Sequence, residues 1–150
     1  MKTIYNQGRL LGHKRYATEI CDCMTKTTVM LVDDQESIRE LVKGVLENAG
    51  FRVILAASGY ECLDKLEKEK PDLILMDIMM PSMDGKETVK KIRHNPKTKD
   101  LAVAFLTVSV ASGFAAKTLK ELGVIDYINK PFENEELIER VNRLLGTLKK

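Results

Sequence analysis

The feature that most constrains the fold is a short apolar run that ends in a carboxylate. Residues 73–76 are all apolar, and Asp77 follows them directly. Pro71 stands before the run, and a loop containing Pro81 and Gly85 stands after it. A run of this length between turn signals is typical of a strand buried on both faces in a parallel sheet. Asp77 is therefore expected at the carboxyl end of that strand, the edge where open α/β sheets bind ligands.

The same pattern of apolar strand and amphipathic helix recurs along the chain. Apolar runs at 29–32, 53–56 and 103–106, together with the segment 124–128, predict four further strands. Apolar residues at helical spacing within 38–49, 62–66, 89–92, 114–122 and 137–148 predict one helix after each strand. Gly50 and Gly123 are placed to end two of these helices in a left-handed conformation, and Ser58 and Glu61 have capping-box spacing.

Five strands in strict alternation with five helices require a parallel sheet with right-handed crossovers and helices on both faces. We therefore predict an α/β protein, a flavodoxin-like (βα)5 three-layer sandwich with sheet order 2-1-3-4-5. In that order the first and third strands are neighbours at the switch point. Asp33, Asp34 and Asp77 should then meet, although they are far apart in the sequence.

Length and apolar content predict one domain, residues 27–150, preceded by an extension of unknown role at 1–26. No apolar run approaches the roughly 18 residues that span a bilayer, and the extension lacks the apolar centre of a signal peptide. Three cysteines are too few for a disulfide framework and agree with a reducing compartment. We expect a soluble cytoplasmic protein with no membrane partner.

The charge distribution disfavours nucleic acid as a partner. Residues 1–26 carry five basic and two acidic side chains, which gives them +3 of the total net charge of +2 and leaves −1 for the remainder. A nearly neutral domain with a mildly basic tail gives no electrostatic reason to expect nucleic-acid binding.

Two features of the extension allow alternative interpretations. Cys21 and Cys23 lie one residue apart without a second pair, which is a weak metal motif, so solvated cysteines are favoured. Met24 leads directly into the first strand, and we hypothesise that translation begins there. An intact mass of the native protein that includes residues 1–23 would exclude that start.

Polar residues follow four of the predicted strands and should share one edge of the sheet. Asp33 and Asp34 follow the first strand, Asp77 the third, Thr107 the fourth and Lys130 the fifth. Three converging carboxylates repel one another and raise at least one pKa unless a cation neutralises them. Hard oxygen ligands with room for water indicate Mg²⁺.

A carboxylate beside Mg²⁺, with a lysine and a hydroxyl nearby, suits phosphoryl transfer, with Asp77 as the best-placed nucleophile. The alternative is that these are exposed loop carboxylates, the usual situation of a single Asp at a strand end. Because the three carboxylates, the hydroxyl and the lysine occur together, a phosphoryl-transfer site is favoured over exposed loop carboxylates.

These motifs closely resemble the receiver domain of two-component response regulators. The resemblance covers about residues 27–148 and depends on four segments. They are Leu31-Val32-Asp33-Asp34, residues 76–85 from Met76-Asp77 to Asp84-Gly85, Leu106-Thr107, and Lys130-Pro131-Phe132.

The resemblance implies that Asp77 is phosphorylated by a sensor histidine kinase or a phosphotransfer protein. It implies that Asp34, Asp77 and the backbone carbonyl of Met79 bind Mg²⁺, and that Asp33 acts on the metal through water. Such a domain accepts a phosphoryl group and loses it again, but it is not a turnover enzyme on a separate substrate.

The resemblance also assigns a lysine and a switch. Lys130 would pair with the phosphoryl oxygens, and its bond to Pro131 is expected to be cis, a form that only X-Pro bonds populate readily. Thr107 would hydrogen-bond the phosphoryl group and draw its loop inward. Tyr127 matches the family's switch aromatic, with an ordinary strand aromatic as the alternative.

One residue departs from the family pattern. The position after the switch hydroxyl is usually Ala or Gly, and here it is Val108. We hypothesise that its branched side chain narrows access to Asp77 and slows both phosphorylation and hydrolysis. Met79, two residues after Asp77, should also disfavour a positioned hydrolytic water.

Other classes of protein share this topology. A flavin-binding protein needs a phosphate loop after the first strand, where Asp33 and Asp34 would repel phosphate. A phosphatase with an aspartate nucleophile usually has a second acid two residues later, where Met79 stands. A phosphorylation-independent interaction scaffold remains the alternative.

No output domain follows residue 150 in this sequence, so we expect a single-domain regulator, either a monomer or a phosphorylation-dependent homodimer. The signal would leave through a downstream protein bound to the face of the fourth helix, fifth strand and fifth helix. That face carries Lys117, Lys120, Asp126, Asn129 and Arg140. The alternative is that these charges only solvate the surface.

Overall fold

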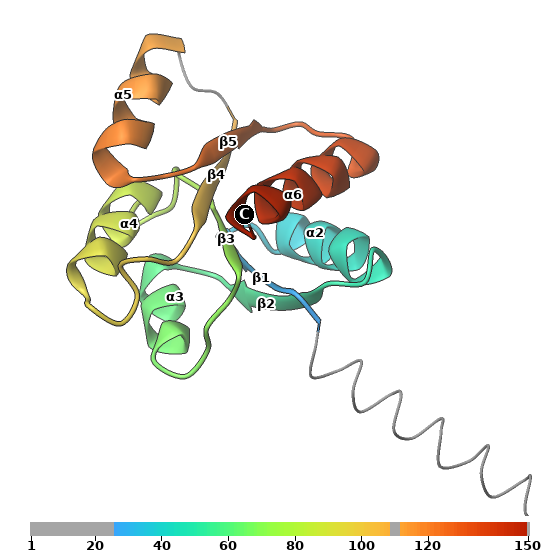
Figure 1. The fold of residues 1–150 in the computed structure, drawn as a ribbon, viewed down its shortest axis with the longest axis horizontal. Coiled ribbons are helices and arrows are strands. Elements are labelled where there is room, and N and C mark those ends of the chain that lie inside the picture. Colours follow the sequence, from blue (N-terminus) through green and yellow to red (C-terminus); the bar gives the residue numbers. More distant parts are fainter. Residues whose placement is uncertain (1–25, 109–111, 150) are drawn as a thin grey trace, which may run out of the picture.

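The computed structural model describes residues 26–108 and 112–149, and the predictions for Cys21, Cys23 and Met24 lie outside that part. Strands and helices alternate as predicted (Figure 1). In chain order the elements are β1 (Thr28–Val32), α2 (Glu36–Asn48), β2 (Arg52–Ala56), α3 (Gly59–Leu66), β3 (Leu73–Met76), α4 (Gly85–His94), β4 (Val103–Thr107), α5 (Ser112–Leu122), β5 (Asp126–Asn129) and α6 (Asn134–Leu148).

The five strands form one parallel sheet in the order β2-β1-β3-β4-β5, which confirms the predicted topology. Helices α2 and α6 cover one face, and α3, α4 and α5 cover the other (Figure 1). Val32 at the end of β1 is in register with Met76 at the end of β3. The acidic residues that follow these two strands therefore lie side by side at the carboxyl edge.

The central strands are buried on both faces because their side chains feed two separate cores. Leu31, Leu75 and Leu106 pack toward α2 and α6, whereas Ile74 and Phe105 pack toward α3, α4 and α5. Apolar residues on both faces explain why these strands read as continuous apolar runs in the sequence.

The predicted helix ends are confirmed with one variation. Gly50 and Gly123 have φ angles of 95° and 60°, in the left-handed region that glycine tolerates. The Ser58 side chain accepts a hydrogen bond of 3.1 Å from the Glu61 N–H. The Glu61 carboxylate returns to the N–H of Ala57, one residue earlier than in a standard capping box.

The fifth strand starts later than predicted, at Asp126 instead of Val124. The N–H of Val124 donates to the carbonyl of Leu119, so this apolar residue completes the end of α5. In the part of the chain that the structure describes, no helix combines the length and the apolar character that membrane crossing requires.

The thiol of Cys62 should be chemically silent in the folded protein. The side chain is buried beside the sulfur of Met30, and burial raises its pKa to about 12. Because the thiolate is the reactive form, we expect almost no alkylation of Cys62 by iodoacetamide at about pH 8 until the protein unfolds. Peptide mass spectrometry with and without urea measures this, and rapid labelling of Cys62 without urea would contradict it.

Candidate functional site

Asp33 is the fixed point of the carboxyl edge. It is fully buried, and both carboxylate oxygens have partners. Oδ1 accepts from the N–H of Gln35 at 2.9 Å, and Oδ2 accepts from Nζ of Lys130 at 2.5 Å. Arg39 donates through Nη1 to the Asp33 carbonyl at 2.8 Å. The ammonium group compensates the buried charge of this carboxylate and fixes its direction.

The structure brings the other two acids to Asp33, as the strand order predicts. Carboxylate oxygens of Asp33, Asp34 and Asp77 all lie within 4.8 Å of one another. Asp34 is exposed, whereas the other two are buried. The cluster is therefore open to solvent on the side of Asp34.

Asp77 has the environment of a carboxylate that needs a cation. It is 5% exposed, and its Oδ1 accepts from the N–H of Met79 at 3.2 Å. Burial raises the pKa of Asp77, and the charges of Asp33 and Asp34 add to the rise, while Lys130 and the Met79 N–H oppose it. A bound cation would favour the ionised form of the carboxylate.

Lys130 connects two of the acids to the end of β4. Its Nζ lies 3.6 Å from Oδ2 of Asp77 as well as against Asp33. Its backbone N–H donates to the carbonyl of Thr107 at 2.7 Å, and the Lys130–Pro131 bond is cis, as expected. Thr107 is buried, and its hydroxyl forms no hydrogen bond with the described residues.

The structure places Tyr127 apart from the acidic cluster. It lies on β5 opposite Phe105 and is partly buried in the core beneath α3, α4 and α5. Its assignment as a switch stays a prediction.

The loop after Asp77 is held close to the site. The N–H of Gly85 donates to the carbonyl of Ile78, and Asp84 caps α4 by accepting from the N–H of Glu87 at 2.8 Å. A Cβ on Gly85 would lie 2.2 Å from the Asp77 carbonyl oxygen, so only glycine fits there. The Met79 side chain is 74% exposed, which leaves it beside the site and outside the core.

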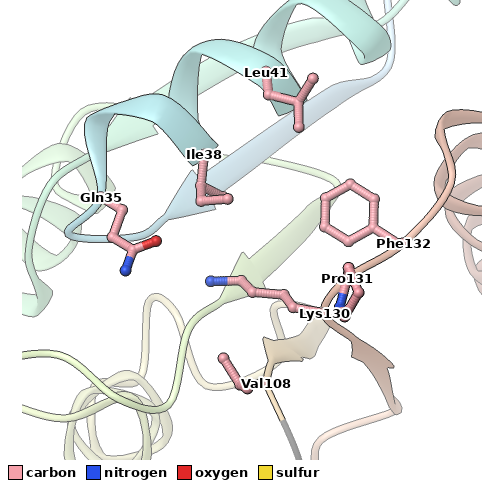
Figure 2. A pocket seen from close by; sticks show the side chains of 7 residues that line it. All are labelled: Gln35, Ile38, Leu41, Val108, Lys130, Pro131 and Phe132. Carbon is pink, nitrogen blue, oxygen red and sulfur yellow. The ribbon is translucent and has the colours of Figure 1, made fainter.

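An apolar groove of about 300 Å³ is lined in part by Lys130 (Figure 2), whose ammonium group pairs with Asp33 and Asp77. Its lining comes from α2, from the end of β4 and from the loop after β5, and consists of Gln35, Ile38, Leu41, Val108, Lys130, Pro131 and Phe132. Val108, the residue that departs from the family pattern, is 63% exposed and lies beside the Lys130 side chain (Figure 2).

Sequence reasoning missed the contribution of Arg39. No motif pointed to it, because its contact joins a side chain to a backbone carbonyl. The available signal was a basic residue in the first turns of the helix that follows Asp33 and Asp34. Its hydrogen bond holds the turn that presents both acids.

The donor set fits a hard divalent cation. Carboxylate and carbonyl oxygens are preferred by Mg²⁺, Ca²⁺ and Mn²⁺, and the described cluster offers no sulfur or imidazole ligand.

Comparison with known proteins gives one consistent result. The family model of the response regulator receiver domain matches residues 29–142. The alkaline phosphatase synthesis transcriptional regulatory protein PhoP of Bacillus subtilis is 41% identical over 118 residues, 78% of this chain and 48% of that protein. The chain thus spans about half the length of the curated relatives it matches.

Two solved structures extend the comparison. The chemotaxis protein CheY4 of Vibrio cholerae has a TM-score of 0.75 and 34% identity, covering 80% of this chain and 99% of that one. The receiver domain of the sensor histidine kinase PA1611 of Pseudomonas aeruginosa has a TM-score of 0.72 and 28% identity, covering 81% and 99%. That structure has a magnesium ion coordinated in its active site cleft.

A pair of glycine substitutions tests the tight packing of the loop. Gly85→Ala forces a methyl group against the Asp77 backbone, so we expect a loss of about 3 kcal/mol in the free energy of unfolding. Gly44→Ala is the control, because that glycine is exposed within α2 with open space around it, and it should gain about 0.5–1 kcal/mol. Urea unfolding measures both, and equal stability of the two variants would contradict the geometry.

Proposed function

This chain belongs to the response regulator receiver domain family, and we propose that Asp77 accepts a phosphoryl group from a sensor histidine kinase or a phosphotransfer protein. One observation carries the proposal. The Asp77 carboxylate shares its position at the sheet edge with two further carboxylates and with an ammonium group 3.6 Å away. That combination provides a nucleophile, ligands for a cation and a counter-charge for phosphoryl oxygens.

In the proposed reaction an oxygen of Asp77 forms a bond to phosphorus while the bond between phosphorus and the donor breaks, and the donor group leaves with the electron pair. The Met79 N–H holds the Asp77 carboxylate by one oxygen. Lys130 is placed to pair with phosphoryl oxygens on that carboxylate, since its Nζ already lies beside Oδ2. The Thr107 hydroxyl, which forms no hydrogen bond within residues 26–108 and 112–149, supplies a further hydrogen-bond donor.

We propose Mg²⁺ as the cation, bound by Asp34, Asp77 and the Met79 carbonyl, with Asp33 acting through water. The oxygen donors of the cluster support this choice, and so does the magnesium ion in the related receiver domain of PA1611. When bound, Mg²⁺ offsets the negative charge of the carboxylates and of the phosphoryl oxygens.

The proposed output begins at the end of β4. Thr107 ends β4, which leads toward α5, and its backbone carbonyl accepts a hydrogen bond from the N–H of Lys130. A movement of Thr107 would therefore be passed on both to Lys130 and to α5. Arg140 on α6 donates to the backbone carbonyl of Tyr127 and pairs with Asp126, which ties the proposed switch aromatic to the α5–β5–α6 face. We propose that a downstream protein binds this face.

The matched segment spans only about half the length of the curated relatives, so we propose an activity only for the receiver domain. We propose that it accepts and loses a phosphoryl group without turning over a separate substrate. The alternative function is a phosphorylation-independent scaffold.

Incubation with acetyl phosphate and Mg²⁺ separates these two functions. The full chain should gain the mass of one phosphoryl group, located at Asp77 by peptide mapping, with acetate as the other product. Asp77→Asn should not gain it, whereas Asp64→Asn, an exposed acid on α3, should behave like the parent. An unmodified parent protein would favour the scaffold.

Substitution of Val108 tests whether its side chain limits access to Asp77. Val108→Ala should raise the rates of phosphorylation by acetyl phosphate and of phosphoryl loss severalfold, because the side chain lies beside Lys130 at the groove. Leu41→Ala, on the far wall of the same groove, should leave both rates unchanged. Time courses of intact mass measure both, and unchanged rates in Val108→Ala would exclude the idea.

A further inference from the structure

The charge of the domain is strongly polarised, although its sum is close to zero. Residues 86–99 carry six basic side chains and one acidic side chain, a net charge of +5. The remainder of 26–149 carries 13 basic and 19 acidic side chains, a net charge of −6. One short segment, α4 with the loop that follows it, therefore holds the positive charge of an otherwise acidic domain.

Four exposed lysines of this segment form what we call the basic surface: Lys90, Lys91, Lys97 and Lys99. None of their ammonium groups has a salt bridge or hydrogen bond within residues 26–108 and 112–149. Elsewhere in the described residues Lys65, Lys117 and Lys130 each pair with a carboxylate, whereas the more scattered Lys68, Lys70 and Lys149 do not. In the described part of the chain these four ammonium groups of the basic surface therefore remain available to carboxylates of another molecule.

The neighbouring arginine of the segment has a different role. Arg93 donates to the carbonyls of Leu122 and Gly123 at the end of α5, and to those of Lys99 and Leu101 before β4. Its guanidinium is thus committed to holding α5 and the loop against α4. Stabilisation of the α4 dipole explains basic residues in its last turn, but Lys97 and Lys99 lie beyond that helix.

We propose that the basic surface binds an acidic segment of a partner protein. Residues 86–99 contain no Phe, Tyr or Trp, so the stacking platforms of single-strand nucleic-acid sites are absent from this segment. Helix α4 has 10 residues and is therefore only about 15 Å long. A DNA duplex or a bilayer extends beyond this segment over the remainder of the domain, whose net charge is −6.

Helices α3 and α5 both pack against α4. Residues 59–70, within and just after α3, carry four acidic and three basic side chains, and α5 carries Lys117, Lys120 and Glu121. Neither neighbour has the positive charge density of the basic surface, so a short acidic segment is favoured over a long polyanion.

The basic surface is separate from the phosphorylation site. Helix α4 begins beside Asp77 at Gly85, whereas Lys97 and Lys99 lie in the loop that enters β4, at the opposite edge of the sheet. A partner bound there leaves the acidic cluster open. The proposal is thus independent of phosphoryl transfer and is tested on the unmodified protein.

The test measures binding of a fluorescein-labelled peptide of alternating Glu and Ala to the full chain by fluorescence anisotropy at low ionic strength. The variant Lys90→Gln/Lys91→Gln/Lys97→Gln should bind roughly tenfold more weakly, because each exposed ion pair contributes modestly and three are removed. The charge-matched control Lys68→Gln/Lys70→Gln/Lys149→Gln removes exposed lysines elsewhere, leaves the extension unchanged, and should bind within about twofold of the parent.

Duplex DNA and vesicles of phosphatidylcholine with phosphatidylserine are the competing probes, and both should bind more weakly than the peptide. Equal weakening in the two triple variants, or no peptide binding by the parent, would overturn the proposal. Tighter binding of DNA or vesicles that is lost with Lys90, Lys91 and Lys97 would overturn it in favour of that class of partner. Equal thermal midpoints of the two variants confirm that both are folded.

Discussion

The buried ion pair between Lys130 and Asp33 is the interaction on which the site depends. The two residues are 97 positions apart and directly follow β5 and β1, so their contact spans the carboxyl edge across β3 and β4. A buried carboxylate is costly without a partner, and removing one member of such a pair typically costs 3–5 kcal/mol. Once Asp33 is neutralised, Asp34 and Asp77 remain as the carboxylates available to a cation.

The sheet order makes this arrangement possible. Because β1 and β3 are neighbours in register, Asp33 and Asp77 leave the sheet together, and Lys130 reaches both of them. Gly85 lets the following loop lie against the Asp77 backbone, which starts α4 directly beside the site. The same helix carries the positive charge of the domain at its other end, so one element connects the phosphoryl site with the basic surface.

Sequence periodicity was sufficient for the fold, since buried parallel strands read as apolar runs and the polar residues after them mark one edge. It did not predict the features that depend on hydrogen bonds to backbone atoms. The start of β5 was predicted too early because Val124 closes α5 through its N–H, and Arg39 and Arg93 act on carbonyl oxygens that no motif records. The net charge of −1 outside the extension also hid a +5 segment, because summing the charges over the whole domain conceals how they are distributed along the chain.

Titration of the full chain with Mg²⁺, followed by ¹⁵N–¹H NMR, shows whether the acidic cluster binds a cation. Saturable shifts are expected at the amides that follow β1 and β3, with an affinity at least tenfold lower in Asp34→Asn, because one of the carboxylate ligands is lost. Asp64→Asn removes an exposed carboxylate from α3 and should leave the affinity unchanged. Equal affinities of Asp34→Asn and the parent protein would show that the cation does not bind at the acidic cluster.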